Sequence, residues 1–153
     1  MIQRLSTIAL ALLAISSPVQ ANELEKYIYS NPVLKEVHKS GTTIRFKDSS
    51  CSKPILGSYN HKTDVMVLCV ANHQSLSELG DTIRHETVHI MQGCLGRPIM
   101  SFQQVADVAQ PTDYQFMKGY GNHSHHHELE ANIAARELTD QQIVKFFKQA
   151  CYS

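Results

Sequence analysis

His85 and His89 stand four residues apart and, with Glu86 between them, form the pattern HExxH. Residues at this spacing lie one above the other on a single face of an α-helix, so both imidazoles can approach one tetrahedral zinc ion. Glu86 would then lie beside the metal and could take a proton from a zinc-bound water, whose pKa the metal lowers toward about 7. The pattern therefore requires a helix here and predicts Glu86 as a general base.

The residues around the motif favour such a helix. Ser75 followed three residues later by Glu78 is typical of a capping box at a helix start, and Gly93 is typical of a helix end. Apolar side chains recur between them at helical spacing: Leu76, Leu79, Ile83, Val88, Ile90 and Met91. We therefore expect the motif to lie within a capped helix and not in a loop.

The first twenty-one residues resemble a signal peptide. Arg4 is followed by an uncharged apolar run from residue 5 to residue 15, and Pro18 and the small residue Ala21 follow that run. We predict cleavage between Ala21 and Asn22, because the run is short for a permanent membrane span. The alternative is a retained membrane anchor. In both cases the rest of the chain is predicted to be exported to the periplasm or the extracellular space.

The chain contains four cysteines, an even number for a small protein bound for an oxidising compartment: Cys51, Cys69, Cys94 and Cys151. They include no CxxC pair, which argues against a thiolate zinc cluster and against a thioredoxin-like redox site. Four cysteines allow three pairings. Because Cys51 and Cys69 flank one predicted hairpin, we favour disulfides between these two and between Cys94 and Cys151.

We predict an α+β fold and a single domain, residues 22–153, because no repeat, linker or shift in composition divides the chain. Two short helices are expected at 22–30 and 32–39. Three alternating, β-branched segments at 42–47, 55–59 and 64–70 are expected to form a small antiparallel sheet. Further helices are expected at 101–110 and after Thr139, which forms a capping box with Gln142.

A catalytic zinc site holds three protein side chains and leaves the fourth position to water. The longer pattern HExxHxxGxxH does not supply the third, because Gln92 stands in place of its glycine and Leu95 in place of its last histidine. Glu128 and Glu130, at the start of a predicted downstream helix, are the carboxylate candidates.

The segments HETVH at 85–89 and ELEAN at 128–132 together resemble the gluzincin branch of the zincin metallopeptidases, whose second helix supplies a glutamate in an ExxA[DN] or ExxxD pattern. The resemblance implies a zincin-like fold, one zinc ion and Glu128 as the third ligand. Glu130, which lies on another face of the same predicted helix, is the alternative ligand, and Glu128 would then only place charge at the helix start. It also implies that Asn132, where the family usually has aspartate, bonds the outer nitrogen of a ligand histidine. In zincins the strand before the first motif is an edge strand, and extended substrate pairs with it. The corresponding strand here would be residues 64–70.

A group of four histidines lies just before Glu128: His123, His125, His126 and His127. The group could be a solvated loop, it could supply His123 as a donor to the oxyanion that develops during hydrolysis, or one member could replace Glu128 as a ligand. Tyr120 is a second candidate oxyanion donor, since a phenol hydroxyl can point at the substrate.

The sequence therefore predicts an exported zinc metallopeptidase that hydrolyses peptides or proteins. The fourteen basic side chains are balanced by fourteen acidic ones, so the chain lacks the excess positive charge that is typical of a nucleic-acid-binding protein, and nucleic acid is not expected as a partner. No stable membrane span is expected after signal cleavage. One alternative is a non-catalytic zinc-binding or interaction protein on the same scaffold. Another is a chance motif in a domain held together by disulfides.

Overall fold

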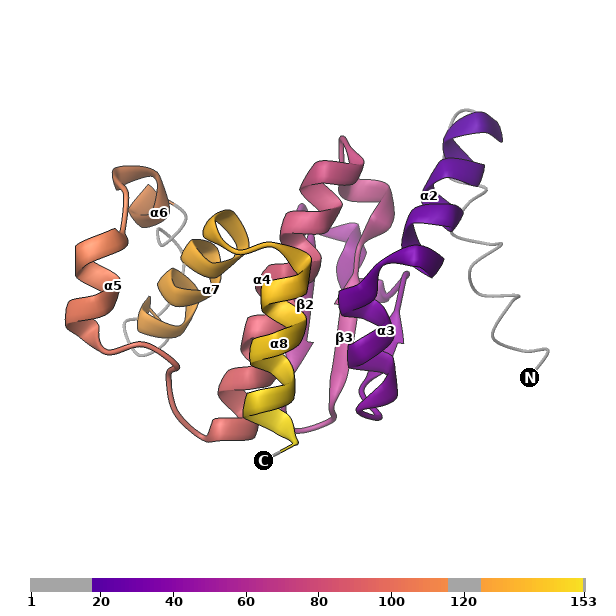
Figure 1. Cartoon of the computed structure of the whole chain (residues 1–153). Coiled ribbons are helices and arrows are strands. Elements are labelled where there is room, and N and C mark those ends of the chain that lie inside the picture. The colour runs from indigo at the N-terminus through magenta and orange to yellow at the C-terminus, as the bar shows by residue number, and fades with distance from the viewer. Residues whose placement is uncertain (1–17, 116–124, 153) are drawn as a thin grey trace. The chain divides into compact units, whose positions relative to one another are not determined.

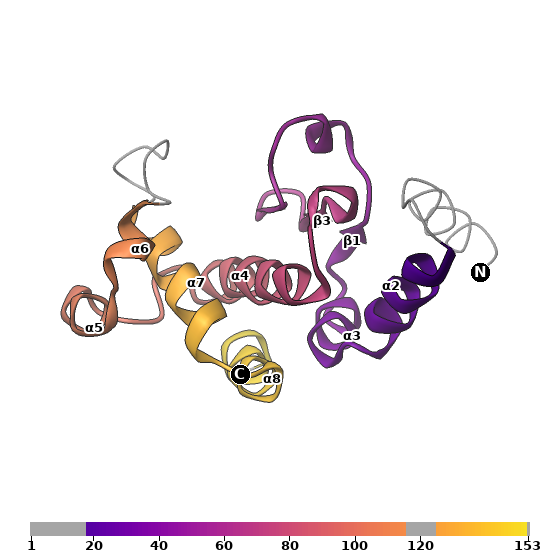
Figure 2. The ribbon, with the colours of Figure 1, turned by 90° about the horizontal axis from the view of Figure 1, so that it is seen from above.

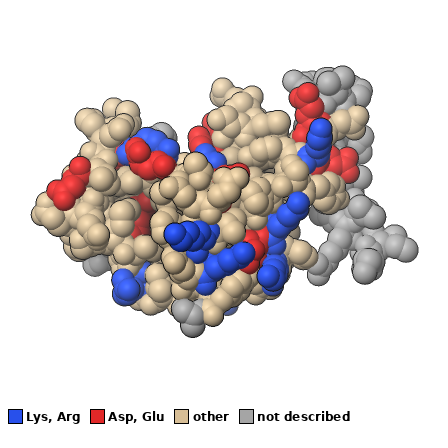
Figure 3. Space-filling view, in the orientation of Figure 1, with Lys and Arg blue, Asp and Glu red and all other residues tan. Residues whose placement is uncertain are grey.

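The computed structural model describes residues 18–115 and 125–152, which form an α+β fold (Figure 1). Over these residues it contains seven α-helices and one three-stranded sheet. The chain divides into two compact units, the first ending at Ile83 and the second beginning at Arg84. The boundary falls inside helix α4 (Leu76–Leu95), and each unit is described by itself. Charged side chains of both signs lie on the face that Figure 3 shows.

Two helices open the first unit, α2 (Pro18–Ser30) and α3 (Pro32–Lys39). Asn31 caps α3, since its side-chain oxygen accepts from the amides of Val33 and Leu34 at 3.0 Å each. Pro32 then occupies the first helical position, where its missing amide hydrogen costs nothing. Helix α2 extends across the predicted cleavage point after Ala21, and most of the predicted signal peptide lies outside the described residues.

The sheet consists of β1 (Thr43–Arg45), β2 (Gly57–Asn60) and β3 (Val65–Leu68) in the order β1-β3-β2. β2 and β3 form an antiparallel hairpin in which Tyr59 pairs with Met66, but β1 runs parallel to β3. The prediction of an antiparallel sheet is therefore wrong, and the sheet is mixed. The chain between β1 and β3 contains a 3₁₀ turn and all of β2, which is long enough for the crossover that parallel pairing requires.

The position of β3 also contradicts the predicted substrate-binding edge. β3 is bonded to β1 on one side and to β2 on the other, so its backbone donors and acceptors are committed to the sheet. Its side chains are largely buried, including Met66 and Leu68. An extended peptide cannot pair with β3 as an added strand.

Each unit contains one disulfide, in the pairing that the sequence favours. Cys51 is joined to Cys69 in the first unit, and Cys94 is joined to Cys151 in the second. Both pairs have Cα atoms 5.2 Å apart, and the described residues include no free cysteine. Two structural disulfides fit a protein of an oxidising compartment such as the periplasm or the extracellular space.

None of the helices within the described ranges is long and apolar enough to cross a lipid bilayer.

In the second unit, the last part of α4 is followed by α5 (Phe102–Val108), α6 (Pro111–Gln115), α7 (His125–Glu137) and α8 (Asp140–Cys151). Capping boxes start two of these helices, with Ser101 and Gln104 at α5 and Thr139 and Gln142 at α8. Helices α5 and α6 lie beside α7 (Figures 1 and 2). A small apolar cluster joins α5 to α7: Val105, Leu129 and Ile133.

Two arginines fix the C-terminal end of α7. Arg84 of α4 donates to the carbonyl of Ala135 at 2.9 Å and to Asp140 at 2.8 Å, and so ties α4 to the turn between α7 and α8. Arg136 forms an ion pair with the buried Asp113 of α6. These contacts hold the last turn of α7 against α4 and α6.

Candidate metal centre

His85 and His89 project from the same face of α4, as helical spacing requires. Their Nε2 atoms lie 3.1 Å apart, and their rings meet nearly at right angles with centroids 4.8 Å apart. Both side chains are mostly buried. The two ring nitrogens therefore converge on one point beside the helix.

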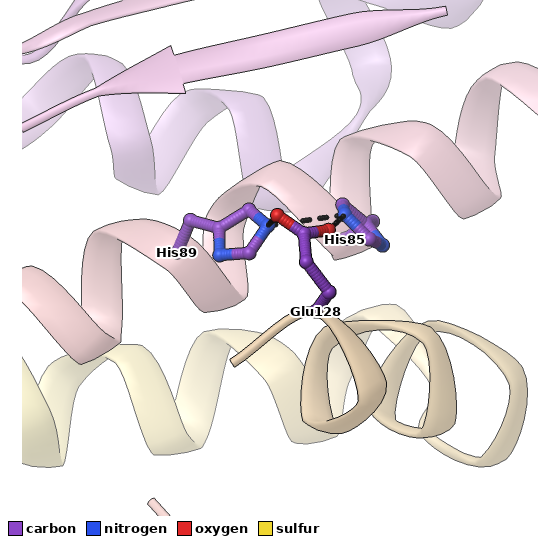
Figure 4. Close-up of side chains that lie close together, drawn as sticks. All are labelled: His85, His89 and Glu128. Carbon is purple, nitrogen blue, oxygen red and sulfur yellow. Dashed lines mark hydrogen bonds and ion pairs between the residues drawn. The ribbon is translucent and has the colours of Figure 1, made fainter. Parts of the chain in front are cut away.

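Glu128, in the first turn of α7, completes this group. Its Oε2 lies 3.2 Å from Nε2 of His85 and its Oε1 lies 3.4 Å from Nε2 of His89, so the carboxylate faces both rings (Figure 4). The three side chains offer ligand atoms that all lie within 4.8 Å of one another, and they could hold a metal ion. The described part of the chain contains no other such group of histidine, cysteine or acidic residues.

The charges of the three residues are coupled. Burial alone would raise the pKa of Glu128, but hydrogen bonds and positive charge from His85 and His89 lower this pKa to about 2. Burial alone would lower the pKa of His89, but bonding to Glu128 and the charges of Glu128 and Glu86 raise it overall. In the absence of a metal, Glu128 is therefore ionised and His89 retains its proton to a higher pH than an ordinary histidine.

Glu86 follows His85 on α4 and is only 5% exposed. Burial raises the pKa of its carboxyl group, the positive charges of His85 and His89 lower it, and the negative charge of Glu128 raises it further. Its Oε2 is buried and has no hydrogen-bond partner among the described residues. Burying a carboxylate oxygen without a hydrogen-bond partner costs folding free energy. Because Oε2 is not engaged by another group of the described residues, it is available to accept a proton beside the possible metal ligands.

Gln92, which replaces the glycine of the longer HExxHxxGxxH pattern, contacts the site directly. Its amide oxygen lies 2.8 Å from Nδ1 of His89, the ring nitrogen that faces away from Glu128. Its position three residues after His89 places it on the same side of the helix, which is the one signal in the sequence for this contact. Asn132 makes no such bond: no hydrogen bond within the described ranges joins its side chain to His85 or His89.

Glu130, the alternative ligand, does not join the group. Its side chain is 1% exposed and accepts hydrogen bonds from the Gln92 amide at 2.7 Å, the backbone amide of Ile99 at 3.0 Å and the backbone amide of Met100. Two residues along a helix correspond to a rotation of about 200°, so Glu128 and Glu130 face nearly opposite sides of α7.

The histidine group before Glu128 is not a loop over the residues that are described. His125, His126 and His127 form the first turn of α7. Nε2 of His126 lies 2.9 Å from the carbonyl oxygen of Met100, and its ring packs edge to face on Phe102. None of these three histidines belongs to the group of possible metal ligands. Tyr120 and His123, the predicted oxyanion donors, lie outside the described residues.

Comparisons of the chain with protein-family models, with curated proteins and with solved structures found no match. The function is therefore inferred from the residues of the site.

Proposed function

We propose that the protein is an exported zinc metallopeptidase in which His85, His89 and Glu128 bind zinc and Glu86 is the general base. The observation that carries this proposal is the convergence of three ligand atoms from two helices beside a buried glutamate oxygen that lacks a partner. The ligands come from positions 43 residues apart in the chain (128 − 85), so their meeting depends on the fold and not on local sequence.

The distances within the site are compatible with a bound zinc ion. Zinc bonds nitrogen and oxygen ligands at about 2.0–2.1 Å, so neighbouring ligand atoms around a tetrahedral ion are about 3.3–3.4 Å apart. The closest distances between the three pairs of side chains here are 3.1, 3.2 and 3.4 Å. Two histidines and one glutamate also form a ligand set that occurs in catalytic zinc sites, which keep the fourth position open.

A zinc ion bound by these residues would supply Lewis acidity, which lowers the pKa of a coordinated water and polarises a carbonyl group. In this proposal, Glu86 accepts a proton from the attacking water at Oε2 and passes it to the leaving amine nitrogen. The raised pKa of its carboxyl group suits both steps, because a general base works best when its pKa approaches the working pH. The substrate class that fits this chemistry is peptides or proteins.

The experiment compares the wild type with Glu86→Gln. Purified protein is analysed for zinc and incubated with a pool of quenched fluorescent peptides. We expect about one zinc per chain in both proteins and cleavage only by the wild type, since glutamine preserves the shape of the side chain but cannot take a proton. Equal cleavage by both proteins would exclude Glu86 as the base. Stoichiometric zinc without cleavage by the wild type would favour the alternative, a zinc-binding protein that is not an enzyme.

A further inference from the structure

The orientation of the Gln92 amide is set by its neighbours. Its Nε2 lies 2.7 Å from a carboxylate oxygen of Glu130 and 3.0 Å from the backbone carbonyl oxygen of His127. Both neighbours accept hydrogen bonds, so the amide group must present its two N–H donors to them. The amide oxygen then faces Nδ1 of His89 at 2.8 Å, and that nitrogen must carry the hydrogen.

Glu130 is in turn held in place by donors. The backbone amides of Ile99 and Met100 and the side chain of Gln92 all donate to its carboxylate, which is 1% exposed. This fixes the carboxylate against the segment that joins α4 to α5. All three neighbours donate N–H groups to this carboxylate. A donor group at the position of the Glu130 carboxylate would face these N–H groups and could not hold the Gln92 amide in its present orientation.

The same amide also reaches the backbone beside the third candidate ligand. His127, whose carbonyl accepts from Gln92, immediately precedes Glu128 on α7. Gln92 is 5% exposed, so its hydrogen bonds are shielded from competing water. One side chain thus fixes the ring of His89 on α4 and the start of α7, the two elements that supply the metal ligands.

We propose that Gln92 and Glu130 are positioning residues of the metal centre. Glu130 orients the Gln92 amide, and the amide oxygen holds His89 with Nδ1 as a donor and with Nε2 free to bind metal. Hydrogen bonds of this kind to a ligand histidine fix its tautomer and ring orientation and raise its basicity. The inference rests on the metal binding in the proposed function, but not on peptide hydrolysis.

The first test is the zinc affinity of Gln92→Leu, measured by competition with a chromogenic chelator. Loss of the amide should weaken zinc about 10- to 100-fold, as for other residues that orient metal ligands. The visible absorption spectrum of the cobalt-substituted protein should also change, because the His89 ring is no longer fixed. Asp113→Asn is the matched control: it weakens a buried ion pair of the same unit that contacts none of the ligands, so stability should fall with unchanged zinc affinity.

A second test needs no variant. In nitrogen NMR spectra of the zinc-loaded wild type, His89 should keep a slowly exchanging hydrogen on Nδ1, where the amide oxygen of Gln92 accepts it, while Nε2 binds the metal. Unchanged affinity in folded Gln92→Leu would overturn the positioning role. If that variant does not fold, a zinc-loaded wild type in which the His89 Nδ1 hydrogen is absent or exchanges freely with water would overturn it. Failure of the wild type to bind zinc would instead remove the proposed function itself, and the inference with it.

Discussion

Glu128 and Glu130 are two residues apart on α7, yet the carboxylate of Glu128 faces the rings of His85 and His89 and that of Glu130 accepts hydrogen bonds from backbone amides. One carboxylate therefore belongs to a group that could hold a metal ion, and the other fixes the segment before α5. The two glutamates differ in partners and not in chemical type, so substitutions of each should have different effects.

Glu128→Gln should reduce zinc affinity more than about 100-fold, because it replaces one of three charged or basic ligands with a neutral amide, a larger loss than that of a residue which only orients a ligand. Glu130→Gln should weaken zinc less, about 10-fold, because it acts on the metal centre only through the Gln92 amide, and it should also lower the free energy of unfolding of the metal-free protein by about 1.5–3 kcal/mol, the range for hydrogen bonds to a charged group. Chelator competition and urea unfolding measure the two quantities. Equal zinc affinity for Glu128→Gln and the wild type would contradict the ligand assignment.

Zinc affinity should increase with pH. The pKa of His89 is raised, so below that pKa a proton must leave the ring before Nε2 can bind metal. The pKa of Glu128 is lowered to about 2, so its carboxylate is ionised throughout the neutral range and contributes no pH dependence there. Titration calorimetry in buffers of different ionisation enthalpy should detect proton release on binding, with the release decreasing as pH rises through the His89 pKa. Binding without proton release below that pKa would be inconsistent with this assignment.

The stability of the metal-free protein should fall in acid partly through Glu128. The folded-state pKa of this group lies below its ordinary value of 4.5, so its contribution is present above pH 4.5 and is lost as pH falls toward about 2. Urea unfolding at a series of pH values should show this loss in the wild type. The difference in stability between the wild type and Glu128→Gln should shrink over the same window, and a constant difference would refute the lowered pKa.

His73 should make the first unit less stable below neutral pH. Its Nδ1 lies 3.0 Å from the carbonyl oxygen of Cys69 and its Nε2 lies 2.9 Å from the Thr82 hydroxyl, and burial lowers its pKa below 6.5 although the Cys69 carbonyl opposes the shift. The unfolded chain therefore takes up a proton first, and stability decreases as pH falls through about 6.5. NMR titration should place the His73 pKa below 6.5, and His73→Gln should remove this part of the pH dependence. A pKa at or above 6.5 would contradict the prediction.

The two disulfides should contribute unequally to stability. Cys94 and Cys151 are separated by 57 residues and Cys51 and Cys69 by 18, so on the loop-closure model the first bridge restricts the unfolded chain more, by about 4 against about 3 kcal/mol. The double serine variants of each pair, compared by urea unfolding, measure the difference. A larger loss from the 51–69 pair would show that loop closure does not govern these bridges.

Local features of the fold could be predicted from the sequence because they depend on residues close together in the chain. The spacing of His85 and His89 places both rings on one helix face, and the caps at Asn31 and Thr139 follow from side chains that reach backbone amides two or three residues away. The same locality explains why Glu86 could be assigned a position beside the ligands.

Features that depend on how separate helices and strands pack against one another were decided only by the tertiary structure. The parallel pairing of β1 with β3 follows from the path of the chain between them, which short alternating segments do not specify. The choice of Glu128 over Glu130 follows from the face that α7 turns toward α4, and the contact of Gln92 with His89 needs Glu130 and His127 to orient its amide. Capping hydrogen bonds and helical periodicity involve residues only a few positions apart, so the sequence alone determines them. The rotation of one helix against another depends on the packing of the whole unit.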